Sequence, residues 1–253
     1  MNWAALDLSI VGPALLAGAI VLSTHVPLGR EVLRRGIIFI DLAVAQTAGV
    51  GVVAANLMGW DVHGVAAQLA AFGAALGAAF LLTWTESRFE QLQEALIGLL
   101  FVLAATGGIL LLAGNPRGGE ELKDLLVGQI LWVDLHTLWP AALISAAVVA
   151  LWLKGRQWLG RPGFYVLFAL SVTISVQLIG IFLVFASLIA PALAVYTFKR
   201  FALVVGYGVG LFGYLAGLML SAQFDLPTGA IIVWAVVALA IVTAAYAPAS
   251  WRR

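Results

Sequence analysis

Long apolar runs alternate with short charged or turn-forming segments along almost the whole chain. The runs fall at 8–28, 36–57, 64–84, 95–113, 137–153, 164–185, 188–198, 201–222 and 229–247. A helix needs about 20 apolar residues to cross a bilayer, so the run at 188–198 is too short to cross alone. Continuous runs, in place of alternating polar and apolar positions, argue against a membrane β-barrel. We predict an all-α polytopic membrane protein with about eight full transmembrane helices and one short, broken helix, all within a single transmembrane domain over residues 1–253.

Composition supports this class and removes several others. Hydrophobic residues make up 63% of the chain and charged residues 10%, and the mean hydropathy is +1.08. Eight spans leave no room for a separate catalytic domain. The near balance of 13 basic and 12 acidic residues gives no reason to expect a nucleic-acid partner. With no cysteine, the chain has no disulfide, thiolate metal site or thiol catalysis.

The distribution of basic residues predicts the orientation. They cluster in alternate loops, at Arg30, Arg34 and Arg35, at Arg88, at Lys154, Arg156 and Arg161, at Lys199 and Arg200, and at Arg252 and Arg253. Cytoplasmic loops carry an excess of Lys and Arg, so we expect these loops inside, the N-terminus outside and the C-terminus in the cytoplasm. The first run lacks the basic residues that precede a cleaved signal, which indicates a retained first helix. This arrangement requires 164–198 to cross and return, with a half-length helix near 186–191.

Three of the polar side chains inside apolar runs are candidates for a translocation pathway. Asp41 and Gln46 lie in the second run, about 140° apart around a helix, and Gln177 lies in the sixth. Ionisable groups inside a membrane are costly and often functional. Asp41 could contact a cation in a pathway or pair with Arg34. Gln177 could line the pathway or bond to a neighbouring helix.

Two loops expected outside contain an Asp-x-His pattern. Asp61 and His63 form one pair, and Asp134 and His136 form the other. Carboxylate and imidazole groups bind divalent cations, so either pair could bind a cation at an external mouth. The alternative is ordinary solvated loop polarity. The loop at 115–136 also contains an apolar stretch, 125–133, that is too short to span and is expected in the interface or as a re-entrant segment.

Acidic residues gather in the second cytoplasmic loop. Glu86, Glu90 and Glu94 lie near Arg88, which only partly offsets their charge. The group predicts a short surface helix, which could be merely solvated or could dock a cytoplasmic partner. Glycines at four-residue spacing, Gly73 with Gly77, Gly206 with Gly210 and Gly213 with Gly217, predict close helix packing within the bundle or a dimer seam.

Motifs of catalysis are missing from the sequence. It contains no nucleophile elbow, no zinc-protease motif and no phosphate-binding loop ending in Lys-Ser/Thr. We therefore expect a transport subunit and not an enzyme, with no cofactor bound by this chain. If the chain pumps a solute, ATP must be hydrolysed by a partner subunit.

Five ordered segments carry a specific resemblance. They are RRGIIFIDLAVAQTAGVG at 34–51, QEALIGLLFVLA at 93–104, DLLVGQIL at 124–131, SVQLIGIFLVFASLIAPALA at 175–194 and FDLPTGAIIV at 224–233. Together they resemble the permease subunits of bacterial zinc, manganese and iron ABC importers, over nearly the whole chain. The resemblance implies a bacterial inner-membrane permease, two copies of which form the pore. Its further implied partners are a cytoplasmic ATPase and an extracytoplasmic metal-binding protein.

The resemblance also implies functional residues. Asp41 would meet the metal, Gln46, Gln177 and Pro191 would lie along the pathway, and the 86–94 loop with Arg156 would face the ATPase. Two departures stand out in the sequence. Family members usually carry His four residues after the second-helix Asp, where this chain has Ala45, and their cytoplasmic segment is usually longer than 154–163 here.

The expected cargo is therefore a divalent metal, zinc or manganese, moved by alternating access. An amide such as Gln46 is a poor substitute for imidazole toward zinc, which favours a rival cargo such as an iron chelate or another small nutrient. The other rivals are an ion-gradient-driven carrier or channel without an ATPase, and a non-transporting membrane scaffold.

Overall fold

The protein is described by a computed structural model in which residues 8–61, 64–155 and 160–246 are placed. In these ranges the chain is helical and contains no strand. The helices are α1 (Leu8–Arg35), α2 (Ile40–Leu57), α3 (Val65–Arg88), α4 (Gln93–Leu112), α5 (Gly118–Val127), α6 (Leu135–Gly155), α7 (Gly160–Ile179), α8 (Ile181–Ala194), α9 (Ala202–Phe224) and α10 (Thr228–Tyr246), with 3₁₀ turns η2 (Glu90–Leu92) and η3 (Ile130–Trp132). Eight helices are long and apolar enough to cross a membrane, and α8 is a shorter apolar helix. The predicted all-α class is confirmed.

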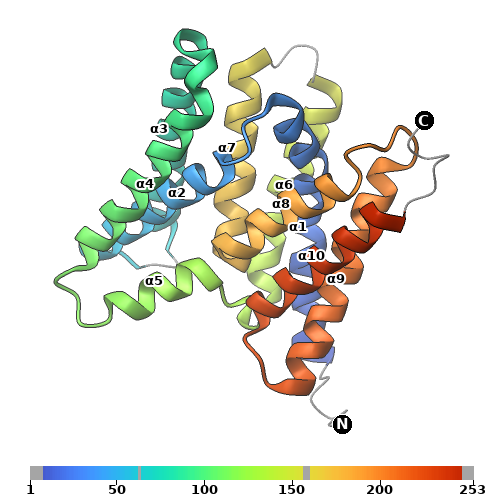
Figure 1. Ribbon diagram of the computed structural model, residues 1–253. Helices are drawn as coiled ribbons and strands as arrows, with labels where there is room; N and C mark the ends of the chain where they lie inside the picture. Colours follow the sequence, from blue (N-terminus) through green and yellow to red (C-terminus); the bar gives the residue numbers. More distant parts are fainter. Residues whose placement is uncertain (1–7, 62–63, 156–159, 247–253) are drawn as a thin grey trace.

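Helices α1, α7 and α8 lie in the middle of the bundle. The pair α3 and α4 lies on one side of them and the pair α9 and α10 on the other (Figure 1). Among the spans, α7 and α2 are the most buried, while α4 and α10 are the least. Large apolar side chains on the outer helices, such as Leu110 and Trp234, are exposed in the monomer. A bilayer accommodates such surfaces, which water would not.

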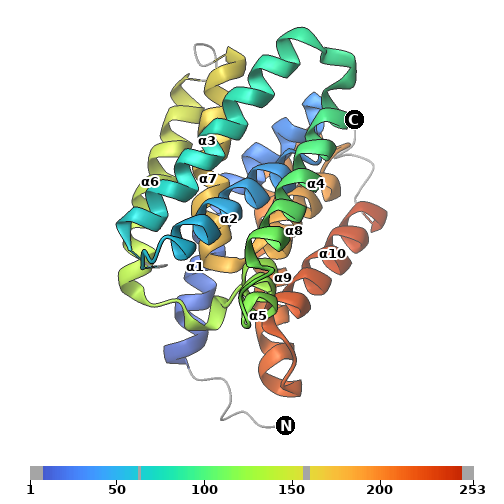
Figure 2. The same ribbon diagram turned by 90° about the vertical axis from the view of Figure 1, so that its left-hand side faces the viewer.

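Basic residues gather at one end of the bundle, which we call the basic end. It holds the end of α1, the α3–α4 connection and the start of α7, toward the top of Figure 1 and Figure 2, while α5 and the α9–α10 loop lie toward the bottom. Arg34, Arg88 and Arg161 lie at the basic end, and Glu120 and Asp225 lie at the opposite end. This separation agrees with the alternation from which the orientation was predicted.

The break after the sixth span lies at Gly180, earlier than the end of the run predicted over 164–185, while the half-length helix predicted near 186–191 lies within α8. Helix α7 ends at Ile179 and α8 begins at Ile181, with Gly180 between them at a φ of 79°. Only glycine adopts this conformation without steric cost. Pro191 instead lies inside α8, near its end, where the helix continues to Ala194. A short helix does follow the full span, as predicted.

Glycines of α9 bring three helices into close contact. A β-carbon on Gly206 would lie 3.0 Å from Val26 of α1, and one on Gly213 would lie 2.5 Å from Val236 of α10. Gly210 packs in the same way against Leu22 of α1, and Gly217 against Ile232. The glycine pairs of α9 therefore pack inside the bundle. Gly73 and Gly77 of α3 have no such neighbour within 4 Å among the placed residues.

Candidate functional site

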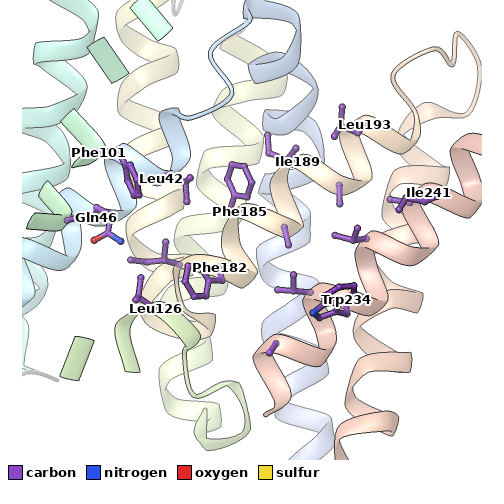
Figure 3. A pocket seen from close by; sticks show the side chains of 18 of the residues that line it. Leu42, Gln46, Phe101, Leu126, Phe182, Phe185, Ile189, Leu193, Trp234 and Ile241 are labelled. Carbon is purple, nitrogen blue, oxygen red and sulfur yellow. The ribbon is translucent and has the colours of Figure 1, made fainter. Parts of the chain in front are cut away.

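A cavity of about 880 Å³ lies where α2, α4, α5, α8 and α10 meet (Figure 3). Its wall is almost wholly apolar. The carboxamide of Gln46 and the indole of Trp234 supply the polar atoms of its side-chain lining. The larger apolar residues of the wall are Leu42, Phe101, Ile109, Leu122, Leu126, Ile181, Phe182, Phe185, Ile189, Leu193, Val233, Val237 and Ile241.

Gln46 reaches the cavity because of its position on α2. It follows Leu42 by four residues, so both side chains lie on one face of the helix. Figure 3 shows the Gln46 amide beside Phe101 and across from Phe182 and Phe185 of α8. Gln46 is 8% exposed. The structure thus places this predicted pathway residue at the wall of the cavity.

Asp41 lies on a different face of α2 and is not part of the cavity wall. Its side chain is completely buried, and neither carboxylate oxygen has a hydrogen-bond partner among the placed residues. The alternative pairing with Arg34 is not present. Arg34 donates to Glu31 at 3.0 Å, and Arg35 donates to the same carboxylate at 2.8 Å. Asp41 is therefore a buried carboxyl group in a membrane helix, and no basic side chain of the described ranges pairs with it.

Ala45 occupies the position one turn after Asp41. It is fully buried, so its methyl group packs in the interior with no exposed surface. The polar neighbour Gln46 points to the cavity instead. The structure therefore does not bring Asp41 and Gln46 together as one ligand pair.

The other two predicted pathway residues differ in burial. Gln177 is exposed near the end of α7 and does not line the cavity. Pro191 is buried in α8, and its neighbours Ala190 and Leu193 belong to the cavity wall. Pro191 thus lies behind the wall, where its missing N–H leaves the Ser187 carbonyl without its helical donor.

The segment after α5 packs against the α7–α8 junction at the end of the bundle opposite the basic end. A β-carbon on Gly180 would lie 2.6 Å from the α-carbon of Gly128, and one on Gly229 would lie 2.5 Å from the carbonyl oxygen of Val127. Three glycines therefore allow this segment to lie between the α7–α8 junction and α10. Leu122 and Leu126 of α5 line the cavity from the same side. The predicted interfacial segment 125–133 is in part the end of this helix.

Asp134 has a structural role that the sequence did not reveal. Its carboxylate accepts hydrogen bonds from the backbone amide and the hydroxyl of Thr137, both at 2.8 Å, and so caps the start of α6. These bonds, the amide bond first, lower the pKa of Asp134. His136 and Asp61 are exposed, and His63 lies outside the described residues. The placed residues contain no group of three or more His, Cys, Asp or Glu side chains that could hold a metal ion.

The acidic loop at the basic end is tied to neighbouring helices. Arg161 of α7 lies 3.0 Å from Glu90 and 3.7 Å from Glu86. Glu90 is largely exposed, whereas Glu86 is nearly buried. Glu94 accepts a hydrogen bond from the backbone amide of Phe39. The loop forms the turn η2 and not a surface helix of several turns.

The other predicted docking residues are Arg88 and Arg156, and the structure describes only Arg88. Arg88 is exposed at the end of α3, on the same surface as the acidic loop. Arg156 lies outside the described residues.

Two buried ionisable residues of α1 were missed in the sequence. His25 is completely buried, with Nδ1 2.9 Å from the carbonyl oxygen of Val21 and with no hydrogen-bond partner for Nε2 in the described part of the chain. Its neighbour Thr24 accepts a hydrogen bond from Ser171 of α7 at 2.7 Å. Glu31 binds the two arginines described above. An ionisable residue within the apolar run 8–28 was a signal that could have found His25.

Similarity to known proteins agrees with this architecture. The chain matches the model of the ABC 3 transport family over residues 7–160 and 161–247. It is 25% identical over 250 residues to the manganese transport system membrane protein MntC of Halalkalibacterium halodurans, covering 90% of this chain and 84% of that protein. It is 30% identical over 149 residues to a probable iron transport system membrane protein of Haemophilus influenzae, covering 50% and 55% of the two chains.

Some relatives are matched over only part of their length. An uncharacterized membrane protein of Synechocystis sp. is 27% identical over 185 residues, and the match spans 64% of this chain and 66% of that protein. Among solved structures, PsaBC from Streptococcus pneumoniae in complex with Fab superposes with a TM-score of 0.76 at 21% identity, over 94% of this chain and 91% of the other. That likeness shows a shared fold. With the family match covering nearly all of the sequence, the chain belongs to the ABC 3 transport family.

Proposed function

We propose that this chain is the membrane permease subunit of an ATP-driven importer for a divalent metal ion, manganese or zinc. The observation that carries the proposal is the family match, which extends over both halves of the chain. The MntC relative, which aligns over most of both chains, is named for manganese transport. Eight membrane spans with no nucleotide-binding motif fit a subunit that needs a separate ATPase.

The cavity wall formed by the placed residues lacks the ligands that would hold a divalent cation in place. A divalent cation prefers several oxygen or nitrogen ligands, and the wall offers one amide among apolar side chains. Such a surface does not repay the loss of the hydration shell. The cargo would then be recognised outside by a separate binding protein and would cross this chain by transient contacts, with Asp41 reached in another conformation.

We further propose the orientation and partners of the assembly. The basic end faces the cytoplasm and the ATPase, which makes the N-terminus external and the membrane the bacterial inner membrane. A second copy of this chain covers the apolar cavity and completes the pathway. Glu86, Arg88, Glu90 and Glu94 border the proposed ATPase surface, and Asp61 and Asp134 lie toward the external mouth.

Reconstitution of the complex tests this function. The chain would be co-expressed with the ATPase and binding protein of its system and placed in liposomes, and ATP hydrolysis and metal uptake would be measured with manganese, zinc and iron. We expect one metal to stimulate both. Asp41→Ala should abolish uptake while leaving membrane expression unchanged, and unchanged uptake would remove Asp41 from the mechanism.

An iron chelate is the second candidate cargo. The relative from Haemophilus influenzae is named for iron transport, and Ala45 leaves Asp41 without the imidazole expected of a zinc site. Stimulation by an iron chelate in the same liposomes, with none by free manganese or zinc, would favour this candidate.

A further inference from the structure

The start of α2 depends on a side chain from another helix. Phe39 occupies the N-cap position of α2 and offers no side-chain hydrogen bond to the first turn. Helix starts leave backbone amides without intrahelical partners, and these amides need acceptors. Glu94, 55 residues later in the chain, accepts from the amide of Phe39 at 3.3 Å, and the amide of Ile38 also faces its carboxylate.

Glu94 lies in the first turn of α4, next to a residue that binds in another direction. Gln93 is buried, accepts from the Thr85 hydroxyl at 2.9 Å and donates to the Leu82 carbonyl oxygen of α3 at 2.9 Å. It also lies 3.1 Å from the Tyr165 hydroxyl of α7. Consecutive side chains therefore connect the start of α4 to α3 and α7 through Gln93, and to α2 through Glu94.

This point belongs to a hairpin at the basic end, formed by residues 86–94. Its outer side chains are exposed, among them Arg88, Phe89 and Leu92. Arg161 ties the hairpin to α7 through Glu86 and Glu90. If the basic end meets the ATPase, as proposed above, the hairpin belongs to the surface that an ATPase would displace.

Asp41 lies two residues after the amide that Glu94 holds. It is in the first turn of α2, and the same helix places Gln46 at the cavity wall. A displacement of the hairpin would therefore act on the start of the helix that carries both residues. The second oxygen of Glu94 is buried and has no hydrogen-bond partner among the placed residues. Within the placed residues, the carboxylate therefore makes its hydrogen-bond contact at the start of α2.

We propose that Glu94 is a positioning residue that transmits movement of the 86–94 hairpin to α2 through the backbone amides of Ile38 and Phe39. The proposal rests on the transport function proposed above. Glu94 itself need not touch the cargo or the ATPase. The proposed role requires a hydrogen-bond acceptor at position 94 and does not require a negative charge there.

Two variants separate the acceptor from the charge. Glu94→Ala removes the acceptor, while Glu94→Gln keeps a carbonyl oxygen of nearly the same reach. Glu120→Ala is the matched control, because Glu120 is an exposed carboxylate on α5 at the opposite end of the bundle.

Hydrogen exchange in the purified permease tests the contact itself. In peptides covering 36–42, Glu94→Ala should speed exchange of the held amides about tenfold, the effect of losing one hydrogen bond to a charged group. Glu94→Gln and Glu120→Ala should leave the rate close to wild type. Unchanged exchange in Glu94→Ala would overturn the proposal.

Transport in liposomes tests the coupling. In the complete complex, the amount of ATP hydrolysed per metal ion imported should rise in Glu94→Ala and stay near the wild-type ratio in Glu94→Gln. Glu94→Ala could speed amide exchange and leave the ratio of ATP hydrolysed to metal imported unchanged. Glu94 would then only cap the start of α2, and its coupling role would be overturned. A wild-type complex that imports no metal would instead overturn the proposed function and the coupling role together, whatever the exchange result.

Discussion

The backbones of Gly128 and Gly180 are in direct contact where the segment after α5 meets the α7–α8 junction. Both residues have positive φ, at 73° and 79°. Two effects therefore disfavour a side chain at each position: the backbone conformation suits only glycine, and the facing backbone leaves no space for a β-carbon. Because this contact lies where α7 turns into α8, it fixes the depth at which the sixth span ends.

Substitution of either glycine should destabilise the fold. We expect Gly180→Ala to cost about 2–5 kcal/mol, from about 1–2 kcal/mol for a left-handed residue with a β-carbon and about 1–3 kcal/mol for overpacking. The midpoint of thermal unfolding in detergent would report this loss. Gly73→Ala is the control, because Gly73 is exposed in α3 with no atom within 4 Å of an added β-carbon. Equal midpoints for the two variants would contradict the close contact.

Removing the charge of Asp41 should not weaken the fold. Asp41→Asn keeps the shape of a side chain whose carboxylate has no partner among the placed residues. Membrane insertion scales penalise a central charge by about 2.5–3.5 kcal/mol, which sets the upper limit of any gain. We expect an unfolding midpoint at or above that of wild type, together with loss of metal uptake. A clear fall in the midpoint would mean that the carboxylate has a stabilising partner.

The hydroxyl of Tyr214 should make a small, measurable contribution to the stability of the fold. Tyr214 of α9 is fully buried, and its hydroxyl lies 2.8 Å from the Ser187 hydroxyl of α8. Hydrogen bonds between membrane helices contribute about 0.6 kcal/mol on average and up to about 1.7 kcal/mol. Tyr214→Phe should lower stability within that range, whereas Tyr196→Phe, at an exposed position, should not. Equal effects of the two substitutions would argue against a bond between α8 and α9.

The cap of α6 should respond to acid. Hydrogen bonds from Thr137 lower the pKa of Asp134, so the cap stabilises α6 above the ordinary aspartate pKa of about 3.9 and is lost as pH falls through the lowered value. Exchange of the Thr137 amide, relative to an unprotected amide at the same pH, should therefore speed up only well below the ordinary aspartate pKa of about 3.9. Asp134→Asn, which keeps an acceptor, should remove most of this pH dependence. Asp134→Ala should show fast exchange at all pH values.

Most of the fold could be predicted because bilayer thickness constrains helix length. Apolar runs and alternating basic loops gave eight spans and one short helix, as found. The break was misplaced because 164–198 is apolar throughout, and neither periodicity nor charge marks a turn within it. Pro191 was the visible signal, but helices tolerate proline near their ends. The decisive feature was the contact of Gly180 with Gly128, 52 positions earlier, which no local pattern shows.

The candidate site was less predictable than the fold. Helical geometry correctly separated Asp41 from Gln46, and the structure places only Gln46 at the cavity wall. The preference of Arg34 for Glu31 over Asp41 depends on side-chain directions that spacing alone leaves open. Glu94 illustrates the same limit. Its acidic neighbours suggested a solvated or docking surface, but its carboxylate reaches back to α2, a contact between residues far apart in the sequence.

The close packing of Gly29 against the backbone of Leu188 joins the α8 side of the cavity wall to α1. A β-carbon on Gly29 would overlap the Leu188 carbonyl, so α1 and α8 cross backbone to backbone. Helix α8 is also bonded to α9 through Ser187 and Tyr214. We therefore expect α8 to move together with α1 and α9, carrying Phe182 and Phe185 on its cavity side with it. Because α9 also packs closely on α10 through Gly213 and Gly217, a change in the width of the cavity is expected to come from α2, α4 and α5 shifting relative to this group of helices.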